Sequence, residues 1–542
     1  MSWHTLGDSA WLATFPGGDA GLRLRSALDL ARLLREAGLP GVADVVNGYD
    51  TVAVWCDPAD LLHVGDDLLR LSGEMPARAW SSSRLFEIPV HYGGEDGPDL
   101  IEVAETLGLS PADVIALHQG ADFEVATIGF SPGFPYLAGL PEALVLPRRS
   151  TPRRVRAGSV AIAGNQAGIY PNDSPAGWHV IGRTSLRLFD AMADEPSTLQ
   201  AGDRVRFVPA TGPCAGPESR ASKPDETSPI ACTVIDAGSR TTIQDGGRPG
   251  FRSVGVTRGG AVDPVSLAVA NLLVGNPVSA AALECCVSGP RLRFQRAARV
   301  AWVGWLGGGR AMDVQAGEEL DLRRGLAGVT GYLAIAGGIE VDPCMGSAAT
   351  DLRGGFGGLA GRALWTGDRL SLGNPSALAP RLGNWCVDWP RRPRRDAVLE
   401  IRCLAGYQGL RFPNDARRTF HESLFPLGAD SDRMGLRFHG PRVCPPPGFE
   451  MVSQPVVAGT VQIPPDGRPT VLMAEAQTLG GYPQIAHVIS ADLPLLARAW
   501  PGTRVRFRLV ELAEAIDAWT ALRDELGVLR AGLQCLGSEP CC

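Results

Sequence analysis

An internal repeat is the feature that most constrains the fold of this chain. The first copy reads AGSVAIAG and later AGDRVRFVP, and the second reads AGTVQIPP and later PGTRVRFRLV. Gly158 and Gly202 of the first copy are 44 positions apart, and Gly459 and Gly502 of the second are 43 apart. Apolar residues alternate with arginine in both RVRF phrases, as in a half-buried strand. The repeat therefore predicts a duplicated all-β module.

The chain has 542 residues, which is too long for one hydrophobic core, so several domains are expected. Short strands between Gly and Pro turns favour compact barrels over a parallel α/β sheet. The predicted fold class is mainly β, with tandem barrels, a small N-terminal α/β subdomain and a C-terminal helix. The predicted division is a first half at 1–210 (subdomain 1–80, barrel 81–210), a Pro- and Ser-rich linker at 211–230, a second half at 231–515 with two barrel-like lobes, and a helix and tail at 516–542.

Composition excludes several classes of function. A formal net charge of −7 provides no general attraction to nucleic acid or to an anionic membrane. No apolar run is long enough for a membrane-spanning helix and no signal peptide is visible, so a cytoplasmic location is expected. The 12 cysteines include no C-x-x-C pair and the eight histidines no H-E-x-x-H, so no dedicated metal site is expected.

Lys223 is the single lysine of the chain, and it lies in the predicted linker. A lysine-bearing phosphate loop is therefore absent, and a covalently attached biotin on this chain is not expected. Anion recognition must then use arginine, backbone N–H groups or helix ends.

The stretch GFSPGFPYLAGLP, residues 129–141, cannot be a helix and is too aromatic for a linker. A run rich in arginine and proline follows it. We expect the aromatic residues to form apolar walls and the arginines to bind an acid group of a small planar ligand, although the arginine run taken alone is better explained as a solvated basic rim. The substrate-binding candidates in this half are Phe134, Tyr136, Arg148, Arg153, Tyr170 and Trp178.

The second half repeats this theme on glycine-rich segments, where close approach of main-chain N–H groups to an anion is possible. Tight turns and solvated carboxylates are the alternative interpretation of the same residues. The candidates are Asp245 and Gln477 for catalysis, and Arg248, Asp263, Arg433 and Tyr482 for substrate binding. In the first half His118 is a third catalytic candidate, because it ends a predicted helix just before the aromatic loop. Its position at the helix end fits better with a residue that merely complements the helix dipole.

Taken together, these segments are similar to a known family. HQGADFEVATIGFSPGFPYLAGLP and the run from PRRSTPRR to WHVIGRT resemble the B subunit of 5-oxoprolinase, also called allophanate hydrolase subunit 1. TIQDGGRPGFRSVGVTRGGAVD, SDRMGLRFHGP and QIPPDGRPTVLMAEAQTLGGYP resemble the C subunit of the same enzyme. Both also look like the carboxyltransferase region of urea amidolyase. The resemblance covers roughly residues 3 to 510, in order.

The resemblance implies cyclophilin-like barrels and ATP-dependent opening of 5-oxoproline to glutamate. It implies that a separate A subunit of 5-oxoprolinase is the partner, with a nucleotide site, for Mg-bound ATP, shared between the two. We expect the chain to be inactive without that partner. Assembly into a homo-oligomer is compatible with the sequence. Two alternatives are a carboxyltransferase component of a biotin-dependent urea carboxylase-type enzyme with its carrier in trans, and a non-enzymatic regulator that binds a histidine kinase. The family pattern is altered at Glu475, Ala476 and Leu479, which puts the usual substrate in doubt.

Overall fold

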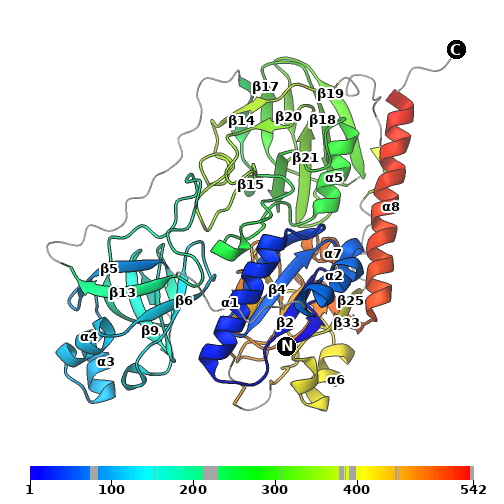
Figure 1. The fold of residues 1–542 in the computed structure, drawn as a ribbon. Helices are drawn as coiled ribbons and strands as arrows, with labels where there is room; N and C mark the ends of the chain where they lie inside the picture. Colours follow the sequence, from blue (N-terminus) through cyan, green and yellow to red (C-terminus); the bar gives the residue numbers. More distant parts are fainter. Residues whose placement is uncertain are drawn as a thin grey trace.

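The computed structural model describes residues 1–73, 84–149, 151, 153–210, 230–306, 308–376, 384, 386–389, 398–445, 448, 449 and 451–537. The predicted linker at 211–230 lies outside these residues except for Ile230, and the tail after 537 lies outside them as well. Within the described ranges, the fold is mainly β, with one closed barrel, a second barrel-like sheet of seven strands, a small α/β subdomain and a C-terminal helix, in agreement with the predicted fold class (Figure 1).

The N-terminal subdomain is an antiparallel sheet in the order β1-β2-β4-β3, with two helices on one face. Strand β4 reads TVAVWC, and all six residues are buried because both faces of the sheet are covered. Val52 and Val54 pack against the helices, whereas Ala53 and Trp55 face the rest of the protein. The elements are β1 (Ser2–Thr5), β2 (Ala10–Thr14), α1 (Ala20–Ala37), β3 (Val42–Asn47), β4 (Thr51–Cys56) and α2 (Leu61–Gly73).

The first barrel is closed and has the strand order β10-β7-β6-β13-β5-β12-β9. Two short helices, α3 (Leu100–Leu107) and α4 (Pro111–Gln119), pack on it, and Ser110 and Asp113 form the predicted capping box of α4. The strands are β5 (Leu85–Tyr92), β6 (Phe123–Ile128), β7 (Pro135–Ala138), β9 (Ser159–Ala163), β10 (Gln166–Ile169), β12 (His179–Arg183) and β13 (Arg204–Pro209), with a ribbon of β8 (Arg153–Val155) and β11 (Ser174–Ala176) beside them.

The second barrel repeats this arrangement strand by strand, which confirms the duplicated module. Its order is β26-β33-β25-β32-β29-β30-β27, and the bridge between Leu427 and Phe438 brings the two edges together. The one parallel pair is β5–β13 in the first barrel and β25–β33 in the second. The elements are β25 (Leu399–Ala405), α6 (Asn414–Glu422), β26 (Phe425–Pro426), β27 (Gly435–Arg437), β29 (Thr460–Gln462), β30 (Thr470–Leu472), β32 (Gln484–Val488), α7 (Leu493–Ala497) and β33 (Arg504–Leu509).

The repeated glycines have the same geometric role in both barrels. Gly158 and Gly459 have φ of 82° and 92°, a region that side chains with a Cβ atom rarely adopt. A Cβ atom at either position would also collide with the backbone carbonyl oxygen of the neighbouring strand, at Thr184 or Val488. The shared AG phrase is therefore a requirement of the turn that begins β9 and β29.

A two-sheet domain lies between the barrels in sequence. Its sheets have the orders β20-β17-β14-β23-β22 and β15-β16-β21-β18-β19-β24. Helix α5 (Pro264–Leu273) packs on the second sheet, and α8 (Leu512–Gly537) runs along this domain and the second barrel (Figure 1). The strands are β14 (Ile230–Asp236), β15 (Arg240–Gln244), β16 (Ala282–Cys286), β17 (Arg291–Phe294), β18 (Ala298–Val303), β19 (Gly309–Val314), β20 (Glu319–Asp321), β21 (Thr330–Ile335), β22 (Ile339–Glu340), β23 (Arg369–Leu372) and β24 (Cys386–Val387).

The N-terminal subdomain packs on both halves of the chain, although it precedes only the first. Asn47 donates to the carbonyl of Ala126 in the first barrel, at 2.6 Å. Asp8 accepts from the backbone and side chain of Ser490 in the second barrel, both at 2.7 Å. The sequence placed this subdomain at the front of the first half, but the structure makes it a bridge between the halves.

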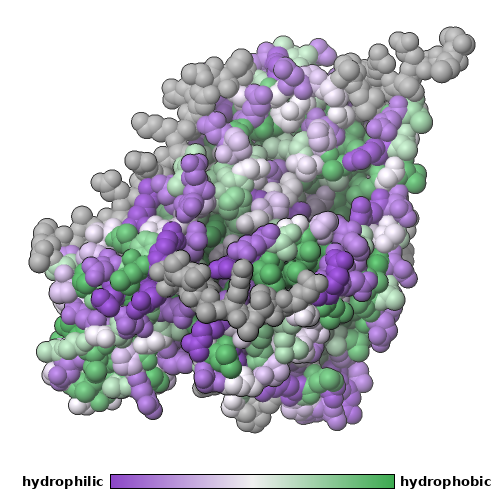
Figure 2. All heavy atoms as spheres, in the orientation of Figure 1, coloured by the Kyte–Doolittle hydropathy of each residue, from purple (hydrophilic) through white to green (hydrophobic). Residues whose placement is uncertain are grey.

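No helix in the described ranges is long and apolar enough to cross a membrane. On the face shown in Figure 2, hydrophilic and hydrophobic residues are intermixed without a broad apolar area.

A buried ion pair fixes the bridge to the second half. The Asp44 carboxylate accepts from the backbone N–H and the guanidinium of Arg252, at 3.1 and 3.0 Å, and its side chain is 1% exposed. We predict that Asp44→Ala lowers the free energy of unfolding by about 3–5 kcal/mol, because it leaves a buried arginine uncompensated. Urea denaturation measures this. Glu36→Ala removes the exposed partner of Arg32 and should change stability by less than about 1 kcal/mol; equal effects would contradict the prediction.

Candidate functional site

The aromatic loop is buried where the N-terminal subdomain and the two barrels meet. Phe134 and Tyr136 are 1% and 6% exposed, and Tyr170 and Trp178 are 2% and 6% exposed. Their rings contact one another at centroid distances of 4.9 to 5.9 Å. The same cluster contains side chains from the other two units: Leu6, Leu12 and Trp55 of the subdomain, and Val457 and Leu479 of the second half. We name this cluster the aromatic junction.

The loop is shaped to fit this position. Phe130 has φ of 66°, which is rare for a residue with a large side chain. A Cβ atom on Gly129 would collide with Leu479, so only glycine lets the two halves approach here. Gly133 donates from its backbone to the carbonyl of Val254 at 2.9 Å. The predicted aromatic residues therefore do gather, but as the core of an interface and not as the open wall of a pocket.

Polar side chains from both halves meet at one edge of the aromatic junction. A hydrogen bond with Ser453 and the charges of Arg148 and Arg353 favour the ionised form of Tyr136, although burial has the larger effect and raises the pKa of its hydroxyl. We name Tyr136, Arg148, Arg353 and Ser453 the junction site. Two of its members come from each half, so neither half forms it alone.

Arg353 is the cation of this site that lies against an aromatic ring. Its guanidinium lies 5.0 Å from the ring centre of Phe130, and it is exposed. Surrounding protein nevertheless lowers its pKa, and the nearby carboxylates Asp351, Asp432 and Glu475 partly offset this. No ion pair of Arg353 within 4.0 Å occurs in the described part of the chain. An exposed cation against an aromatic floor suits a small carboxylate-bearing ligand.

Arg433 is held in a buried network instead of facing a ligand. Its guanidinium donates to Glu475 at 2.6 Å, to Glu284 and to the carbonyl of Gly260. Tyr332 donates to Glu284 at 2.7 Å. Arg433 therefore joins the second barrel to the two-sheet domain, and Glu475, one of the departures from the family pattern, is its partner within the second barrel. The expected contact of Arg433 with substrate does not fit this geometry.

The basic stretch is largely a structural feature. Arg149 and Arg153 both donate to Asp99, whose side chain is 2% exposed and also accepts from the backbone of Val180. Arg153 was expected to bind substrate, but its guanidinium is already engaged in pinning its loop to the barrel. Arg148 is exposed and is the arginine of this run that lies near Tyr136.

The carboxylates expected in the second half also have structural partners. Asp245 accepts from Gly247, Ser347 and Ala348, all at 2.7 Å. Asp263 caps α5 by accepting from the backbone and hydroxyl of Ser266. Asp263 also lies 3.5 Å from the Arg498 guanidinium, so both carboxylates are engaged by structural partners.

Three other candidates lie around these turns. Arg248 is 1% exposed and donates to the carbonyl of Ala349, so it is buried away from solvent. Gln477 and Tyr482 lie on the two sides of Leu479, on the segment that contacts the aromatic loop, and Tyr482 is 45% exposed. These two remain candidates for substrate contact.

His118 does not fit the catalytic role predicted for it. It is 0% exposed and stacks on Phe207 at 4.4 Å in the core of the first barrel. Tyr92 is its hydrogen-bond partner at 2.8 Å. Burial lowers the pKa of its imidazole to about 3, so it stays neutral in the folded protein.

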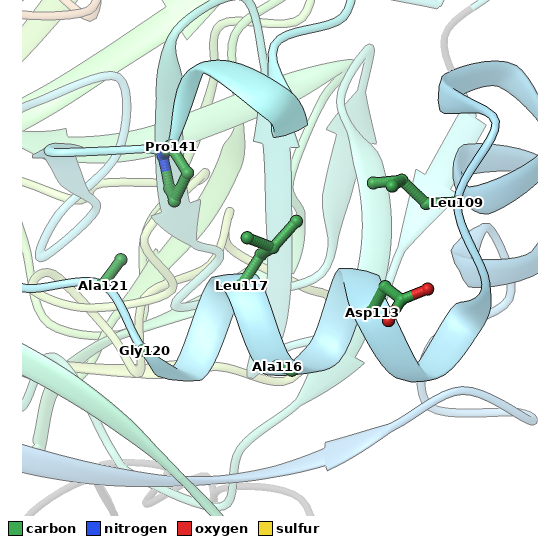
Figure 3. Close-up of a pocket in the computed structure, with 7 residues that line it drawn as sticks. All are labelled: Leu109, Asp113, Ala116, Leu117, Gly120, Ala121 and Pro141. Carbon is green, nitrogen blue, oxygen red and sulfur yellow. The ribbon is translucent and has the colours of Figure 1, made fainter.

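A hollow on the outside of this barrel lacks the chemistry of a site. Leu109, Leu117 and Pro141 point toward it, and Asp113 lies at one end (Figure 3). The Asp113 carboxylate is occupied by the capping box of α4. The hollow is therefore apolar and is not our candidate.

Two family models match the chain. "Carboxyltransferase domain, subdomain C and D" matches residues 1–199, and "Carboxyltransferase domain, subdomain A and B" matches residues 254–509. The C subunit of 5-oxoprolinase from Escherichia coli is 38% identical over 301 residues, which are 53% of this chain and 93% of that protein. The B subunit of 5-oxoprolinase from Haemophilus influenzae is 40% identical over 210 residues, which are 38% of this chain and 97% of that protein.

The chain belongs to the family of the B and C subunits of 5-oxoprolinase. It carries both in one polypeptide. The crystal structure of TTHA0988 covers 92% of this chain and 99% of its own, with 39% identity and a TM-score of 0.81. Urea amidolyase of Lachancea kluyveri is 28% identical over 309 residues, 52% of this chain but 17% of that protein. The relationship to carboxyltransferase regions is therefore confirmed.

The sequence did not identify Arg353 and Ser453 of the junction site, nor Tyr49, whose buried hydroxyl lies near Tyr136. Arg353 lies in TDLRGGFGG, a segment within the family resemblance but without a charge pattern that marks it. Ser453 and Tyr49 carry no local signal at all, because only the packing of the three units brings them to Tyr136.

The buried His118 makes stability depend on pH. Below its ordinary pKa of about 6.5 the unfolded state binds a proton that the folded state excludes until about pH 3, so stability falls as pH falls. Between pH 7.5 and 5 this loss is about 2 kcal/mol. We predict that His118→Gln shrinks the stability difference between these pH values by that amount, as measured by urea denaturation. His63→Gln, at a side chain 73% exposed, is the control and should leave the difference unchanged.

Proposed function

We propose that the chain is the fused B–C component of an ATP-dependent 5-oxoprolinase, which opens 5-oxo-L-proline to L-glutamate together with a separate A subunit. The observation that carries this is the junction site, because it takes Tyr136 and Arg148 from the B-like half and Arg353 and Ser453 from the C-like half. Relatives of both halves bear the name of the same enzyme, and the C and B subunits described above are matched over 93% and 97% of their lengths. A site made from both halves explains why one enzyme needs both.

The chemistry of the junction site suits 5-oxo-L-proline. Arg353, with Arg148 beside it, would hold the substrate carboxylate. Phe130, under the Arg353 guanidinium, would give the five-membered ring an apolar contact, and Tyr136 could donate to an oxygen of the substrate. Burial raises the pKa of Tyr136, so its hydroxyl keeps its proton and acts as a donor.

We assign no residues of this chain to the nucleotide. The only lysine, Lys223, lies outside the described residues, and those described contain no group of three or more His, Cys, Asp and Glu side chains that could hold a metal ion. We propose that the A subunit supplies most of the Mg–ATP site and that the complex is cytoplasmic. Names that call the relatives subunits are consistent with such a partner.

A carboxyltransferase component of a urea carboxylase-type enzyme is the second candidate. It is favoured by the match to the carboxyltransferase models and to urea amidolyase. A regulator that binds a histidine kinase has no such support. It would use the first half alone, whereas the junction site needs residues from both halves.

Reconstitution tests the proposed function. The purified chain should hydrolyse ATP negligibly, and adding the 5-oxoprolinase A subunit from a related organism should give ATP hydrolysis that depends on 5-oxo-L-proline and releases glutamate. Coupled assays of ADP and glutamate measure both products. Transfer of carboxyl from carboxybiotin to urea, without glutamate formation, would favour the second candidate instead.

We predict that Arg353→Ala weakens the apparent affinity of this complex for 5-oxo-L-proline about ten- to a hundredfold, because a charged hydrogen bond contributes about 1.5–3 kcal/mol. Arg353→Lys should be nearly as damaging, since it loses the planar fork. The measurement is the substrate dependence of ATP hydrolysis. Arg154→Ala is the control: it removes the same charge from a side chain 82% exposed and should match the parent. Equal behaviour of Arg353→Ala and Arg154→Ala would remove Arg353 from the site.

A further inference from the structure

Buried polar atoms without hydrogen-bond partners gather beside the junction site. Gln454, Gln462 and Gln484 are 7%, 3% and 0% exposed, and we name them the glutamine cluster. Within the described residues, the amide nitrogens of all three have no partner, and neither does the amide oxygen of Gln484. The hydroxyls of Tyr49 and Thr478 are buried and unpartnered as well.

The second barrel brings these amides together. Gln462 on β29 is the cross-strand partner of Gln484 on β32, next to a bulge that shifts the register of the pair. Gln454 lies in the short strand β28 (Gln454–Pro455) and pairs with Gly480 of β31 (Leu479–Gly480). A Cβ atom on Gly480 would overlap the amide nitrogen of Gln462, so the glycine leaves room for this amide. The cluster therefore comes from three strands, β28, β29 and β32.

The cluster adjoins the junction site from two sides. Gln454 follows Ser453, which interacts with the Tyr136 hydroxyl. The Thr478 hydroxyl lies 3.0 Å from the Cβ position of Gly129, at the start of the aromatic loop. Tyr49 lies near Tyr136, and burial raises the pKa of its hydroxyl, so it remains a donor. The polar surface thus continues from the charged junction site to a neutral part lined by amides and hydroxyls.

Unpartnered amides in a protein interior are costly, and nearly all buried polar groups in native structures have a partner. Here three amide nitrogens and two hydroxyls offer donors, against one amide oxygen that only accepts. A complementary ligand would therefore be neutral at this end and richer in acceptors than in donors. A lactam, with one carbonyl and one N–H, has this character, whereas a second ionised group would find no counter-charge among the three glutamines.

We propose that the glutamine cluster is the subsite that binds the lactam group of the substrate, with Tyr49 and Thr478 beside it. This rests on the proposed function for the identity of the lactam, but not for the presence of a neutral amide-binding site. Arg353 then selects the carboxylate and the glutamines select the amide, which separates two recognition tasks in space. The glutamines are positioning residues and take no part in bond breaking.

Calorimetric titration of the purified full chain tests this with three probes. They are 5-oxo-L-proline, cyclopentanecarboxylate, which has the carboxylate alone, and 2-pyrrolidinone, which has the lactam alone. Gln462→Met and Gln484→Met should each weaken the binding of 5-oxo-L-proline and of 2-pyrrolidinone by up to about tenfold, which is the effect of losing one neutral hydrogen bond. Binding of cyclopentanecarboxylate should not change. Arg353→Ala should weaken the binding of 5-oxo-L-proline and cyclopentanecarboxylate and leave the binding of 2-pyrrolidinone unchanged.

Melting temperature separates recognition from a structural role. Because the amides have no partner without ligand, Gln462→Met and Gln484→Met should keep or raise the melting temperature of the free chain. Gln244→Met is the matched control, since this buried amide donates to the carbonyl of Thr350 at 3.1 Å. It should lower the melting temperature and leave all three affinities unchanged.

Lower melting temperatures for the cluster variants with unchanged affinities would overturn the inference, and would mean that the amides hold ordered water only. Failure of the wild-type chain to bind any lactam would overturn it too. Lactam-selective binding of 2-pyrrolidinone without binding of 5-oxo-L-proline would support the subsite and contradict the proposed function. If the reconstituted complex releases glutamate but Gln462→Met binds the lactam probes as tightly as the parent does, the proposed function would be supported and the lactam subsite contradicted.

Discussion

Burial of the aromatic loop among three folding units is the constraint on which the rest of the structure depends. Phe134, Tyr136, Tyr170 and Trp178 bury their rings against side chains of the N-terminal subdomain and of the second half. A large apolar area removed from water at one point fixes the relative positions of all three units. Only with these positions fixed do the charges of Arg148 and Arg353, which are 205 positions apart in the chain, act on one hydroxyl, that of Tyr136.

Pairing of charges decides which arginines remain available to a ligand. Arg153 and Arg433 are each satisfied by buried carboxylates, and so contribute to the architecture. Arg353 is instead exposed against the Phe130 ring, with carboxylates near but not bonded to it. An arginine whose electrostatic needs are already met has little to gain from a substrate, whereas one in this intermediate state gains a full charge-assisted bond. Of the arginine run that was predicted to bind a ligand, only Arg148 belongs to the junction site, which it shares with Arg353 of the second half.

The fused arrangement has a physical consequence for this site. The relatives that match the two halves are named as separate subunits, B and C. Here both sides of the junction site and the bridging subdomain are parts of one polypeptide, so their association is intramolecular and its effective concentration does not depend on dilution. The Asp44–Arg252 and Asp8–Ser490 contacts hold the bridge against the second half at two separate points. The shared site is therefore preorganised, which lowers the entropic cost of binding a small ligand.

The sequence by itself determined the duplicated barrel, because the spacing of the AG and RVRF phrases reflects glycine turns and alternating strands, both of which are local properties. It also determined the family, and it identified the aromatic residues that meet at the junction. Only the tertiary structure decided which polar residues come together at the junction site. His118, Arg153 and Asp245 resemble site residues in their local sequence. In the structure His118 is buried in the barrel core, Arg153 is bonded to Asp99, and Asp245 is bonded to Ser347. Arg353 and Ser453 have no local signal, because their role follows from long-range packing that brings distant segments together.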